Sequence, residues 1–368
     1  MRIRGAVLEE VGRSAPYAVS RPITICELEL DGPGPGEILV KIDASGLCHS
    51  DLSVVNGVRP RPVPMLLGHE SAGTVAMLGP GVDDLTVGQR VVMTFLPRCG
   101  QCAGCETSGK LPCEVGAASN GAGTLLGGGL RLNRGGQIVR HHLGVSAFAT
   151  HAVVNRLSVV PVPRDVPPEI AALLGCAVLT GGGAVLNVGN PQAGQDLLIV
   201  GLGGVGMAAV ITAVALGRGR VIGVDTVEPK LAWARKLGAD AVYTTARALE
   251  IGLKAPVVIE AAGHRRAFEA AVQLTAPGGT TVTVGLPHPD ARAEISPLVL
   301  TTEARTIIGS YLGSAVPSRD IPTYVEMYRE GRLPVQGLIS STIGLDEINE
   351  AMDALAQGEA LRQIIIFE

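Results

Sequence analysis

The chain has 368 residues, which predicts about two domains and allows a substantial core. Its 30 basic and 34 acidic residues leave a net charge of −4, so the charge does not indicate binding to nucleic acid or to an anionic membrane. Glycine is enriched at 49 residues, and we expect it in tight turns and close backbone approaches. Seven cysteines and a start, MRIRGAVLEE, without a signal peptide indicate thiolate or metal chemistry in a reducing cytoplasm.

The predicted elements change character along the chain. Residues 1–177 hold many short strand patterns separated by Gly and Pro, which predict an all-β, barrel-like domain; the glycine-rich stretch 116–136 within it is expected to be an irregular loop. In residues 178–312 strand runs alternate with helical runs, which predicts a doubly wound parallel α/β sheet of about six strands. Residues 313–368 predict two amphipathic helices and a last strand, RQIIIF, that returns to the first domain. Leu197–Gly217 is apolar enough to cross a membrane, but its glycines indicate a buried strand, turn and helix.

The strongest local motif is a run of four cysteines, Cys99, Cys102, Cys105 and Cys113. Four thiolates at this spacing can meet one metal ion tetrahedrally, and an all-cysteine quartet is a common structural zinc set. Ferredoxin runs also begin C-x2-C-x2-C, so an iron–sulfur cluster is the alternative. The fourth cysteine here follows after seven residues instead of three, which favours a closed zinc site that stabilises a lobe of about 97–115.

A second motif has the pattern G-x-G-x-x-G directly after the strand run LLIV and before a helical run. This context predicts a tight turn that lets the backbone approach a pyrophosphate. Asp225 ends the next strand run, where a carboxylate accepts hydrogen bonds from a ribose diol and repels a 2′-phosphate. We therefore expect NAD rather than NADP. The motif consists of Gly201, Leu202, Gly203, Gly204, Val205 and Gly206.

A third set of residues is dispersed. Cys48, His69 and Cys176 lie in three separate segments, and Cys/His/Cys is a known ligand set for a catalytic zinc that keeps one position open. Spacing alone does not bring these segments together. His141-His142 is interpreted as part of a polar loop rather than as another metal site, and Cys26 as a plain strand residue.

The motifs resemble those of the zinc-dependent alcohol dehydrogenases of the medium-chain dehydrogenase/reductase superfamily. The resemblance covers essentially the whole chain and rests on GLCHSD, GHE, the four-cysteine lobe, GCAVLTG, GLGGVG with its Asp, and LRQIIIF. It implies a chaperonin-10-like all-β catalytic domain and a Rossmann domain, with the C-terminal segment returning to the first. It also implies two zinc ions per subunit, one catalytic and one structural, with NAD as cofactor, and a homodimer or homotetramer paired through the run TIIGSYLG.

The resemblance assigns roles to individual residues. Cys48, His69 and Cys176 hold the catalytic zinc, and Glu70 is the carboxylate that approaches the metal during ligand exchange. Asp51 orients the histidine ligand, and Ser50 bonds the substrate oxygen and begins the proton relay. The resemblance further implies nucleotide contacts for Thr180, Val205, Asp225, Lys230, His49 and Arg362, while Phe95 is expected to form a pocket wall.

Two departures from the family pattern bear on function. Many members carry a histidine three residues after the relay hydroxyl, where this chain has Ser53, so water or His49 would carry the proton out. Glutathione-dependent formaldehyde dehydrogenases carry an arginine shortly after the lobe, and this chain has none in Cys113–Ala117. The stretches TGGGAVLNVGNPQAG and IPTYVEMYREGRLP look most like those of bacterial aryl-alcohol members, which implies a medium-chain or aromatic alcohol as substrate. The alternatives are the formaldehyde enzyme, a metal-free quinone reductase and a non-catalytic NAD-binding scaffold.

Overall fold

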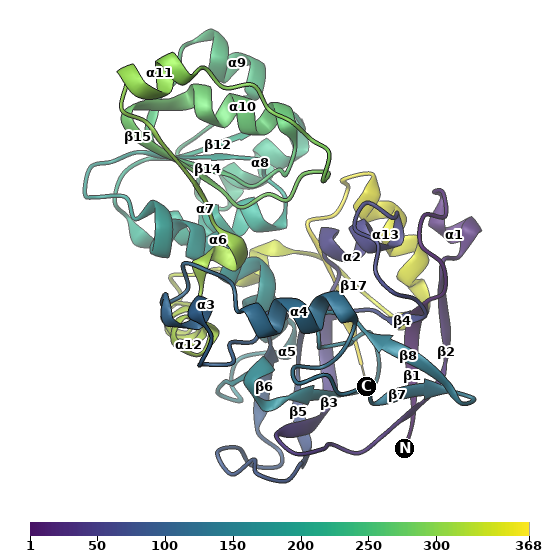
Figure 1. The fold of residues 1–368 in the computed structure, drawn as a ribbon. Helices are drawn as coiled ribbons and strands as arrows, with labels where there is room; N and C mark the ends of the chain where they lie inside the picture. The colour runs from purple at the N-terminus through teal and green to yellow at the C-terminus, as the bar shows by residue number, and fades with distance from the viewer. Residues whose placement is uncertain (368) are drawn as a thin grey trace. The chain divides into compact units, whose positions relative to one another are not determined.

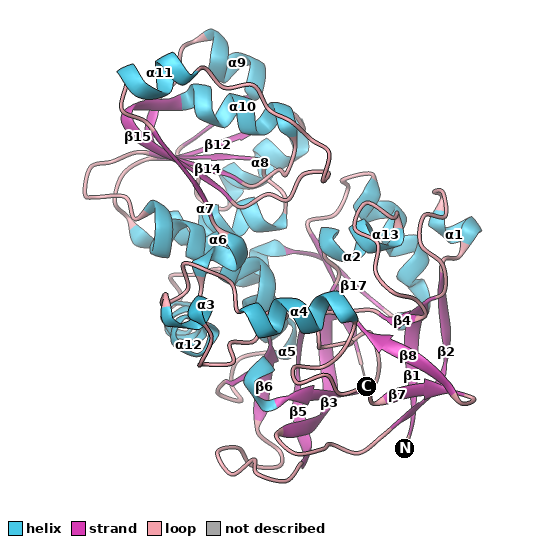
Figure 2. Ribbon diagram, viewed as in Figure 1, coloured by secondary structure: helices cyan, strands magenta, loops and turns pink. Residues whose placement is uncertain are grey.

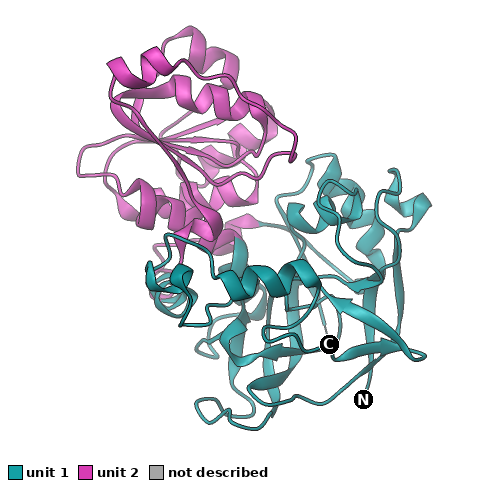
Figure 3. Ribbon diagram, viewed as in Figure 1, with its two compact units in different colours: residues 1–176, 316–325, 339–368 teal, residues 177–315, 326–338 magenta. Residues whose placement is uncertain are grey.

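The computed structural model describes residues 1–367, which divide into two compact units (Figure 3). The first unit contains residues 1–176, 316–325 and 339–368, and the second contains residues 177–315 and 326–338. We expected all of 313–368 to return to the first domain, but residues 313–315 and 326–338 belong to the second unit. The C-terminal segment therefore contributes to both units.

The first unit is built mainly from strands, in a barrel and an open sheet (Figures 1 and 2). The closed barrel has the order β1-β2-β7-β8-β4, and the open sheet has the order β10-β6-β5-β3-β18-β17 with β9 paired to β3. The last strand pairs antiparallel with β3, as the apolar run RQIIIF predicted. The strands are β1 (Arg2–Leu8), β2 (Ile23–Leu30), β3 (Glu37–Gly46), β4 (Met65–Leu66), β5 (Glu70–Leu78), β6 (Arg90–Met93), β7 (Leu132–Arg134), β8 (Gln137–His141), β9 (His151–Asn155), β10 (Val159–Pro161), β17 (Ile339–Ile343) and β18 (Arg362–Ile366).

The second unit contains the predicted α/β alternation. Its six strands are all parallel, in the order β13-β12-β11-β14-β15-β16, with helices on both sides of the sheet (Figure 2). The strand β11 is wholly buried, as expected for a central parallel strand. The strands are β11 (Leu197–Val200), β12 (Val221–Asp225), β13 (Ala241–Thr244), β14 (Ala255–Glu260), β15 (Thr275–Thr283) and β16 (Thr306–Gly309).

The helices are mostly short and connect or cap the strands. The expected helical runs of the second unit correspond to α7, α8 and α10, and those of the C-terminal segment to α12 and α13. In chain order the helices are α1 (Tyr17–Ser20), α2 (His49–Val55), α3 (Ala103–Glu106), α4 (Glu114–Ala122), α5 (Pro168–Leu173), α6 (Leu179–Gly183), α7 (Gly204–Leu216), α8 (Glu228–Lys236), α9 (Thr245–Glu250), α10 (Arg265–Leu274), α11 (Pro297–Thr302), α12 (Pro317–Arg329) and α13 (Ile348–Ala356).

One helical stretch was not predicted. Residues Pro168–Gly189 run continuously through α5 and α6 with two π-helical segments, Leu174–Val178 and Ala184–Gly189. The stretch is long and apolar enough to cross a membrane, but its most apolar 18-residue window, with a mean hydropathy of 1.8, is 89% buried inside the protein, as in a core helix. By contrast Leu197–Gly217, the segment that resembled a membrane span, is divided into β11, a turn and α7, as predicted.

The stretch 116–136 is not an irregular loop, so that expectation is wrong. It carries most of α4 and the whole of β7. The sulfur of Cys113 caps α4 by accepting a hydrogen bond from the backbone N–H of Gly116, and Gly123 ends the helix at a φ of 69°. A cysteine is not a usual cap, so helix propensity does not reveal this start.

Candidate active site

The four cysteines of the predicted structural zinc site lie together around α3. Their sulfur atoms are all within 4.8 Å of one another. The Sγ–Sγ distances are 3.9 Å for Cys99–Cys105 and 3.9 Å for Cys102–Cys113. A thiolate tetrahedron around zinc has an edge of about 3.8 Å, given a Zn–S distance of about 2.3 Å. The donor set and its spacing therefore fit a structural zinc ion.

Backbone N–H groups hold these sulfurs. The N–H groups of Cys99 and Gly116 both donate to Sγ of Cys113, each at 3.3 Å. The backbone N–H of Glu114 lowers the pKa of Cys102 to about 6, because a hydrogen bond to sulfur favours the thiolate. The local backbone therefore favours the thiolate, which is the metal-binding form, at Cys102, whereas burial raises the pKa of Cys105 to about 11.

The dispersed ligand set also converges, and it does so entirely within the first unit. Donor atoms of Cys48, His69, Glu70 and Cys176 lie within 4.8 Å of one another, and all four residues are buried. Sγ of Cys176 is 3.5 Å from Nε2 of His69. A sulfur and a nitrogen that share a tetrahedral zinc are separated by about 3.5 Å. Two thiolates and one imidazole at this spacing fit a zinc ion that keeps a fourth position for substrate, with the carboxylate of Glu70 next to it.

Glycines let the ligand-bearing backbone approach its neighbours. Gly68 precedes the histidine ligand at a φ of +96°, and a Cβ there would lie 2.4 Å from the backbone nitrogen of Phe148. A Cβ on Gly175, which precedes the third ligand, would lie 2.1 Å from the carbonyl oxygen of Met93. The glycines of the motifs GHE and GC are therefore required for packing as well as for chain direction.

Cys176 lies in the π-helical segment Leu174–Val178. A π segment inserts one extra residue into a helix and is frequently found at functional sites. Here it separates α5 from α6 and carries the ligand in a buried turn, where Cys176 is 4% exposed. The unpredicted helix thus carries the third of the predicted ligands.

Asp51 supports the cluster from the first turn of α2. Its Oδ1 lies 2.9 Å from Nδ1 of His69, and its Oδ2 accepts the backbone N–H of Cys48 at 3.0 Å. Burial disfavours its charge, but the imidazoles of His69 and His142 hold the pKa of Asp51 below its usual range. An ionised carboxylate on Nδ1 leaves Nε2 of His69 free to bind a metal.

Arg362 lies behind the ligands. It is 3% exposed, and its Nε donates to Oε1 of Glu70 at 3.3 Å while its Nη2 donates to Sγ of Cys48 at 3.7 Å. Burial raises the pKa of Glu70 to about 7, although the arginine charge opposes this. A hydrogen bond from Cys176 lowers the pKa of Cys48 well below its usual range. The arginine therefore stabilises negative charge in the cluster, a role beyond the pyrophosphate contact expected from the resemblance.

The residues of the predicted proton relay lie on α2. Ser50 is half-buried near the helix start, and His49 beside it is exposed. Ser53, where many relatives have a histidine, is 4% exposed and donates its hydroxyl proton to the carbonyl of His49 at 2.9 Å. Its hydroxyl is thus engaged within the helix, which leaves His49 or water as the path to solvent.

His142 lies in a loop, as expected, but His141 is the last residue of β8, and each residue is only 1% exposed. Nε2 of His141 accepts the backbone N–H of Arg131 at 3.1 Å. Nδ1 of His142 lies 3.3 Å from Oδ1 of Asp51. Sequence reasoning missed this second histidine at the site, since its partner lies far away in the chain.

The glycine motif forms the turn between β11 and α7 in the second unit. Gly201 has a φ of +91°, and a Cβ on Gly206 would lie 1.8 Å from the carbonyl oxygen of Gly201. A Cβ on Gly203, by contrast, would meet no atom within 4 Å. The helix therefore starts with an open face of free N–H groups, the arrangement that accepts a pyrophosphate.

Asp225 lies at the end of β12, beside this turn. Its Oδ2 accepts the backbone N–H of Leu202 at 2.7 Å, and its Oδ1 accepts that of Val227 at 2.9 Å. Lys230 is half-buried on α8, and Thr180 is 9% exposed on α6. The carboxylate therefore fixes the glycine turn in addition to its expected contact with a ribose.

Glu260 is a buried residue of the second unit that the sequence analysis did not single out. It ends β14 at 1% exposure, and its Oε1 accepts the backbone N–H groups of Ala262 and Gly263 at 2.9 and 2.7 Å. Its Oε2 accepts the hydroxyl of Thr283 at 2.7 Å. The sequence signal that could have identified Glu260 is its position as a carboxylate at the end of the apolar run PVVIE.

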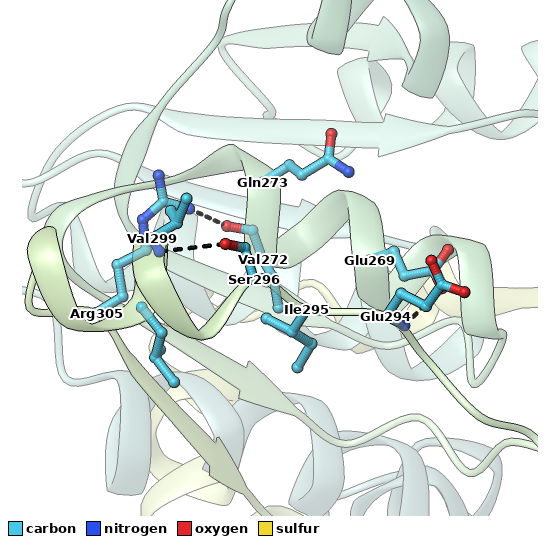
Figure 4. A pocket seen from close by; sticks show the side chains of 9 residues that line it. Glu269, Val272, Gln273, Glu294, Ile295, Ser296, Val299 and Arg305 are labelled. Carbon is cyan, nitrogen blue, oxygen red and sulfur yellow. Dashed lines mark hydrogen bonds between the residues drawn. The ribbon is translucent and has the colours of Figure 1, made fainter.

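A surface pocket of the second unit lies away from these clusters in the chain (Figure 4). It is lined by residues of α10, α11 and the segment before α11, with Arg305 at one side donating to the carbonyl of Val272. None of the residues predicted to bind metal, cofactor or substrate lines it.

Two family models match the chain. The model described as "Alcohol dehydrogenase GroES-like domain" matches residues 34–164, and the model described as "Zinc-binding dehydrogenase" matches residues 204–330. The first match contains most of the proposed metal ligands, and the second begins within the glycine motif. The two matches thus fall on the two kinds of site that the geometry singles out.

Individual proteins match along the whole chain. Alcohol dehydrogenase B of Mycobacterium tuberculosis is 34% identical, with 99% of this chain and 98% of the relative covered. The NDMA-dependent alcohol dehydrogenase of Amycolatopsis methanolica is also 34% identical, with coverages of 100% and 99%. The crystal structure of benzyl alcohol dehydrogenase from Acinetobacter calcoaceticus has a TM-score of 0.91 at 31% identity, with both chains fully covered. The chain therefore belongs to the zinc-dependent alcohol dehydrogenases of the medium-chain dehydrogenase/reductase superfamily.

Proposed function

We propose that this chain oxidises a medium-chain or aromatic alcohol, primary or secondary, to the aldehyde or ketone, with NAD as the hydride acceptor, and catalyses the reverse reaction. The observation that carries the proposal is the buried cluster of Cys48, His69, Glu70 and Cys176, whose donor spacing fits zinc. The alcohol class also rests on the likeness to benzyl alcohol dehydrogenase.

In this proposal Cys48, His69 and Cys176 hold the catalytic zinc, and Glu70 is the carboxylate that approaches the metal during ligand exchange. A structural zinc is held by Cys99, Cys102, Cys105 and Cys113. A zinc ion bound at the first cluster supplies Lewis acidity that lowers the pKa of an alcohol hydroxyl. The structural site has no open position, so its contribution is to the stability of the lobe. One catalytic and one structural ion per subunit are expected.

The protein residues orient the substrate and move its proton. Ser50 accepts the hydroxyl proton of the substrate and passes it towards His49 or water, because the hydroxyl of Ser53 is engaged with a helix carbonyl. Asp51 holds the His69 ring, and Arg362 balances the negative charge of Glu70. The substrate carbon loses a hydride to the cofactor and the oxygen loses a proton, so the oxidation is balanced.

The second unit binds the cofactor in this proposal. The pyrophosphate lies on the N–H groups at the start of α7, where Gly203 leaves space, and Asp225 accepts the ribose hydroxyls. Lys230 flanks the adenosine ribose, Thr180 and Val205 lie behind the nicotinamide, and His49 and Arg362 contact the pyrophosphate. NAD is favoured because the Asp225 carboxylate repels a 2′-phosphate.

The proposed assembly is a homodimer or homotetramer. The strand β16 lies at one edge of its sheet, and Ile308 on it is 42% exposed. An exposed apolar edge strand is a ready site for pairing with a second copy. Light scattering would give the mass in solution, and a monomer at assay concentrations would contradict this part of the proposal.

The direct test is NADH formation from benzyl alcohol and NAD, measured by absorbance, together with the zinc content of the purified protein. We expect activity and two zinc ions per chain. Cys48→Ser should lose one zinc and turnover while it still binds NAD, whereas Cys26→Ser, outside both clusters, should keep both. Full activity of Cys48→Ser would exclude the proposed role of this cluster. Turnover with the hydroxymethyl adduct of glutathione, and none with alcohols, would instead indicate the formaldehyde enzyme.

A further inference from the structure

We propose that His142 is a positioning residue of the catalytic zinc site, which holds the Asp51 carboxylate against the zinc ligand His69. The inference rests on the proposed metal site, but it concerns a residue that neither the family motifs nor the resemblance singles out. His142 and Asp51 lie 91 positions apart in the chain and meet at the site.

The geometry places two imidazoles on one carboxylate oxygen. Nδ1 of His69 and Nδ1 of His142 lie 2.9 and 3.3 Å from the same atom, Oδ1 of Asp51. The two rings stand nearly perpendicular, at 88°, with their centroids 5.5 Å apart. All three residues are buried. The carboxylate is therefore in contact with a ring on each side, and it cannot rotate away from His69 without losing its contact with His142.

The direction of the second ring is fixed by its own backbone. The N–H of His142 donates to Oγ of Ser146 at 2.8 Å, and that hydroxyl donates to the carbonyl of Leu66 at 2.8 Å. Nδ1 of His142 forms no hydrogen bond with any residue in the described part of the chain, and the charged atom that it approaches is Oδ1 of Asp51, at 3.3 Å. A buried polar nitrogen without another partner favours this one contact.

The physical consequence is for the orientation of His69. The metal-binding nitrogen of this ring is Nε2, and the Asp51 contact on Nδ1 selects both the tautomer and the ring angle. The other carboxylate oxygen of Asp51 is held by the N–H of Cys48. His142 adds to this support, because its buried Nδ1 lies 3.3 Å from the oxygen that contacts His69 and so restrains the carboxylate at that oxygen. Loss of such supporting contacts typically lowers metal affinity 10- to 100-fold.

His141 offers a matched control. It is the preceding residue, it is equally buried at 1% exposure, and its Nε2 accepts a backbone N–H from Arg131. Among residues 1–367, its ring forms no hydrogen bond, ion pair or ring contact with Asp51 or His69. A substitution at His141 therefore reproduces the loss of a buried imidazole without touching the Asp51 carboxylate.

The experiment compares His142→Leu, His142→Asn, His142→Gln and His141→Leu. The readouts are zinc affinity at each site, by chelator competition, thermal unfolding, and kcat and KM for benzyl alcohol. We expect His142→Leu to weaken the catalytic zinc by 10- to 100-fold and to leave the four-cysteine zinc unchanged. His141→Leu should lose a similar amount of thermal stability while both zinc affinities stay within about twofold. In the zinc-loaded His142→Leu protein we expect kcat to fall more than KM rises, because a misoriented His69 ring displaces the metal rather than the substrate.

The amide variants keep the test decisive if the leucine variant does not fold. An asparagine amide can place a donor near the Nδ1 position, whereas a glutamine amide reaches the Nε2 position, so only His142→Asn should restore zinc affinity to near wild type. Equal zinc affinity in the asparagine and glutamine variants, or parallel changes for His142→Leu and His141→Leu, would overturn the proposal. The donor atoms of Asp51, His69 and His142 also lie within 4.8 Å of one another, so loss of a third bound metal ion on His142→Leu would overturn the proposal as well. If Cys48→Ser retains both zinc ions, the failure lies in the proposed metal site and not in the role of His142.

Discussion

The imidazole of His69 is held from behind by Asp51, at 2.9 Å from Nδ1 to Oδ1, while its Nε2 lies 3.5 Å from the sulfur of Cys176. One ring thus connects a buried anion on one side to the metal ligands on the other. The carboxylate of Asp51 is itself held in place, because its Oδ2 accepts the backbone N–H of Cys48. Asp51 can therefore fix the orientation of the His69 ring.

This arrangement predicts the effect of Asp51→Asn. The amide keeps the size of the side chain but removes the charge that holds the His69 tautomer, so we expect catalytic zinc affinity to fall 10- to 100-fold and kcat/KM to fall at least as much. The four-cysteine zinc should be unaffected. Chelator competition and steady-state kinetics measure the two effects. Asp43→Asn, which replaces a carboxylate that accepts the hydroxyl of Thr74 outside the site, is the control. Equal zinc affinity in both variants would contradict the role of Asp51.

Loss of zinc from the four-cysteine lobe is expected to lower the stability of the protein without removing its catalytic activity. Cys102→Ser removes one ligand of the structural zinc, so we expect one zinc to be lost and the free energy of unfolding to fall by roughly 3–5 kcal/mol. The catalytic zinc should remain, with activity retained below the lowered unfolding temperature. Zinc analysis and thermal unfolding test this, and Cys26→Ser is the control. A Cys102→Ser protein of unchanged stability would show that the lobe needs no metal.

Much of the fold could be predicted because its signals are local. The parallel alternation is visible in runs such as LLIV and PVVIE, which correspond to β11 and β14. The four cysteines lie within one short stretch, so spacing alone predicted their cluster. Cys48, His69 and Cys176 needed the family motifs, because no pattern of period or spacing links segments so far apart.

The features that were missed depend on contacts between distant segments. The helix from Pro168 to Gly189 contains the run TGGG, whose glycines normally disfavour a helix. In the structure they are required by close packing, since a Cβ on Gly181 would lie 2.2 Å from the carbonyl of Val205. The place of His142 at the site was missed because its partner, Asp51, is identified only by the folded structure.

The glycine turn predicts a variant that folds normally and loses its cofactor. Gly203 has a φ of −80°, which alanine adopts without strain, and its Cβ would meet no protein atom. We therefore expect Gly203→Ala to change the free energy of unfolding by less than about 0.5 kcal/mol. Its methyl group would occupy the place proposed for the pyrophosphate, so the Kd for NAD should rise at least tenfold. Titration of protein fluorescence with NAD measures this.

Gly121→Ala controls for the Gly203→Ala result. Gly121 lies within α4, and its added Cβ would also meet nothing within 4 Å. Because alanine is the better helix former by about 1 kcal/mol, this variant should be slightly stabilised and should bind NAD as the wild type does. Wild-type NAD affinity in Gly203→Ala would place the pyrophosphate elsewhere.

The last prediction concerns cofactor choice at Asp225. Its carboxylate is proposed to bind the ribose hydroxyls and to repel a 2′-phosphate, so Asp225→Asn should lower the ratio of kcat/KM for NAD to that for NADP at least tenfold. The variant should also lose some stability, because the carboxylate accepts the N–H groups of both Leu202 and Val227 and an amide has only one acceptor oxygen. Asp240→Asn is a matched control, since Asp240 accepts the N–H of Val221 at the opposite end of β12. If both variants lose stability but neither changes the cofactor ratio, Asp225 only supports the turn, and the preference for NAD must come from another residue.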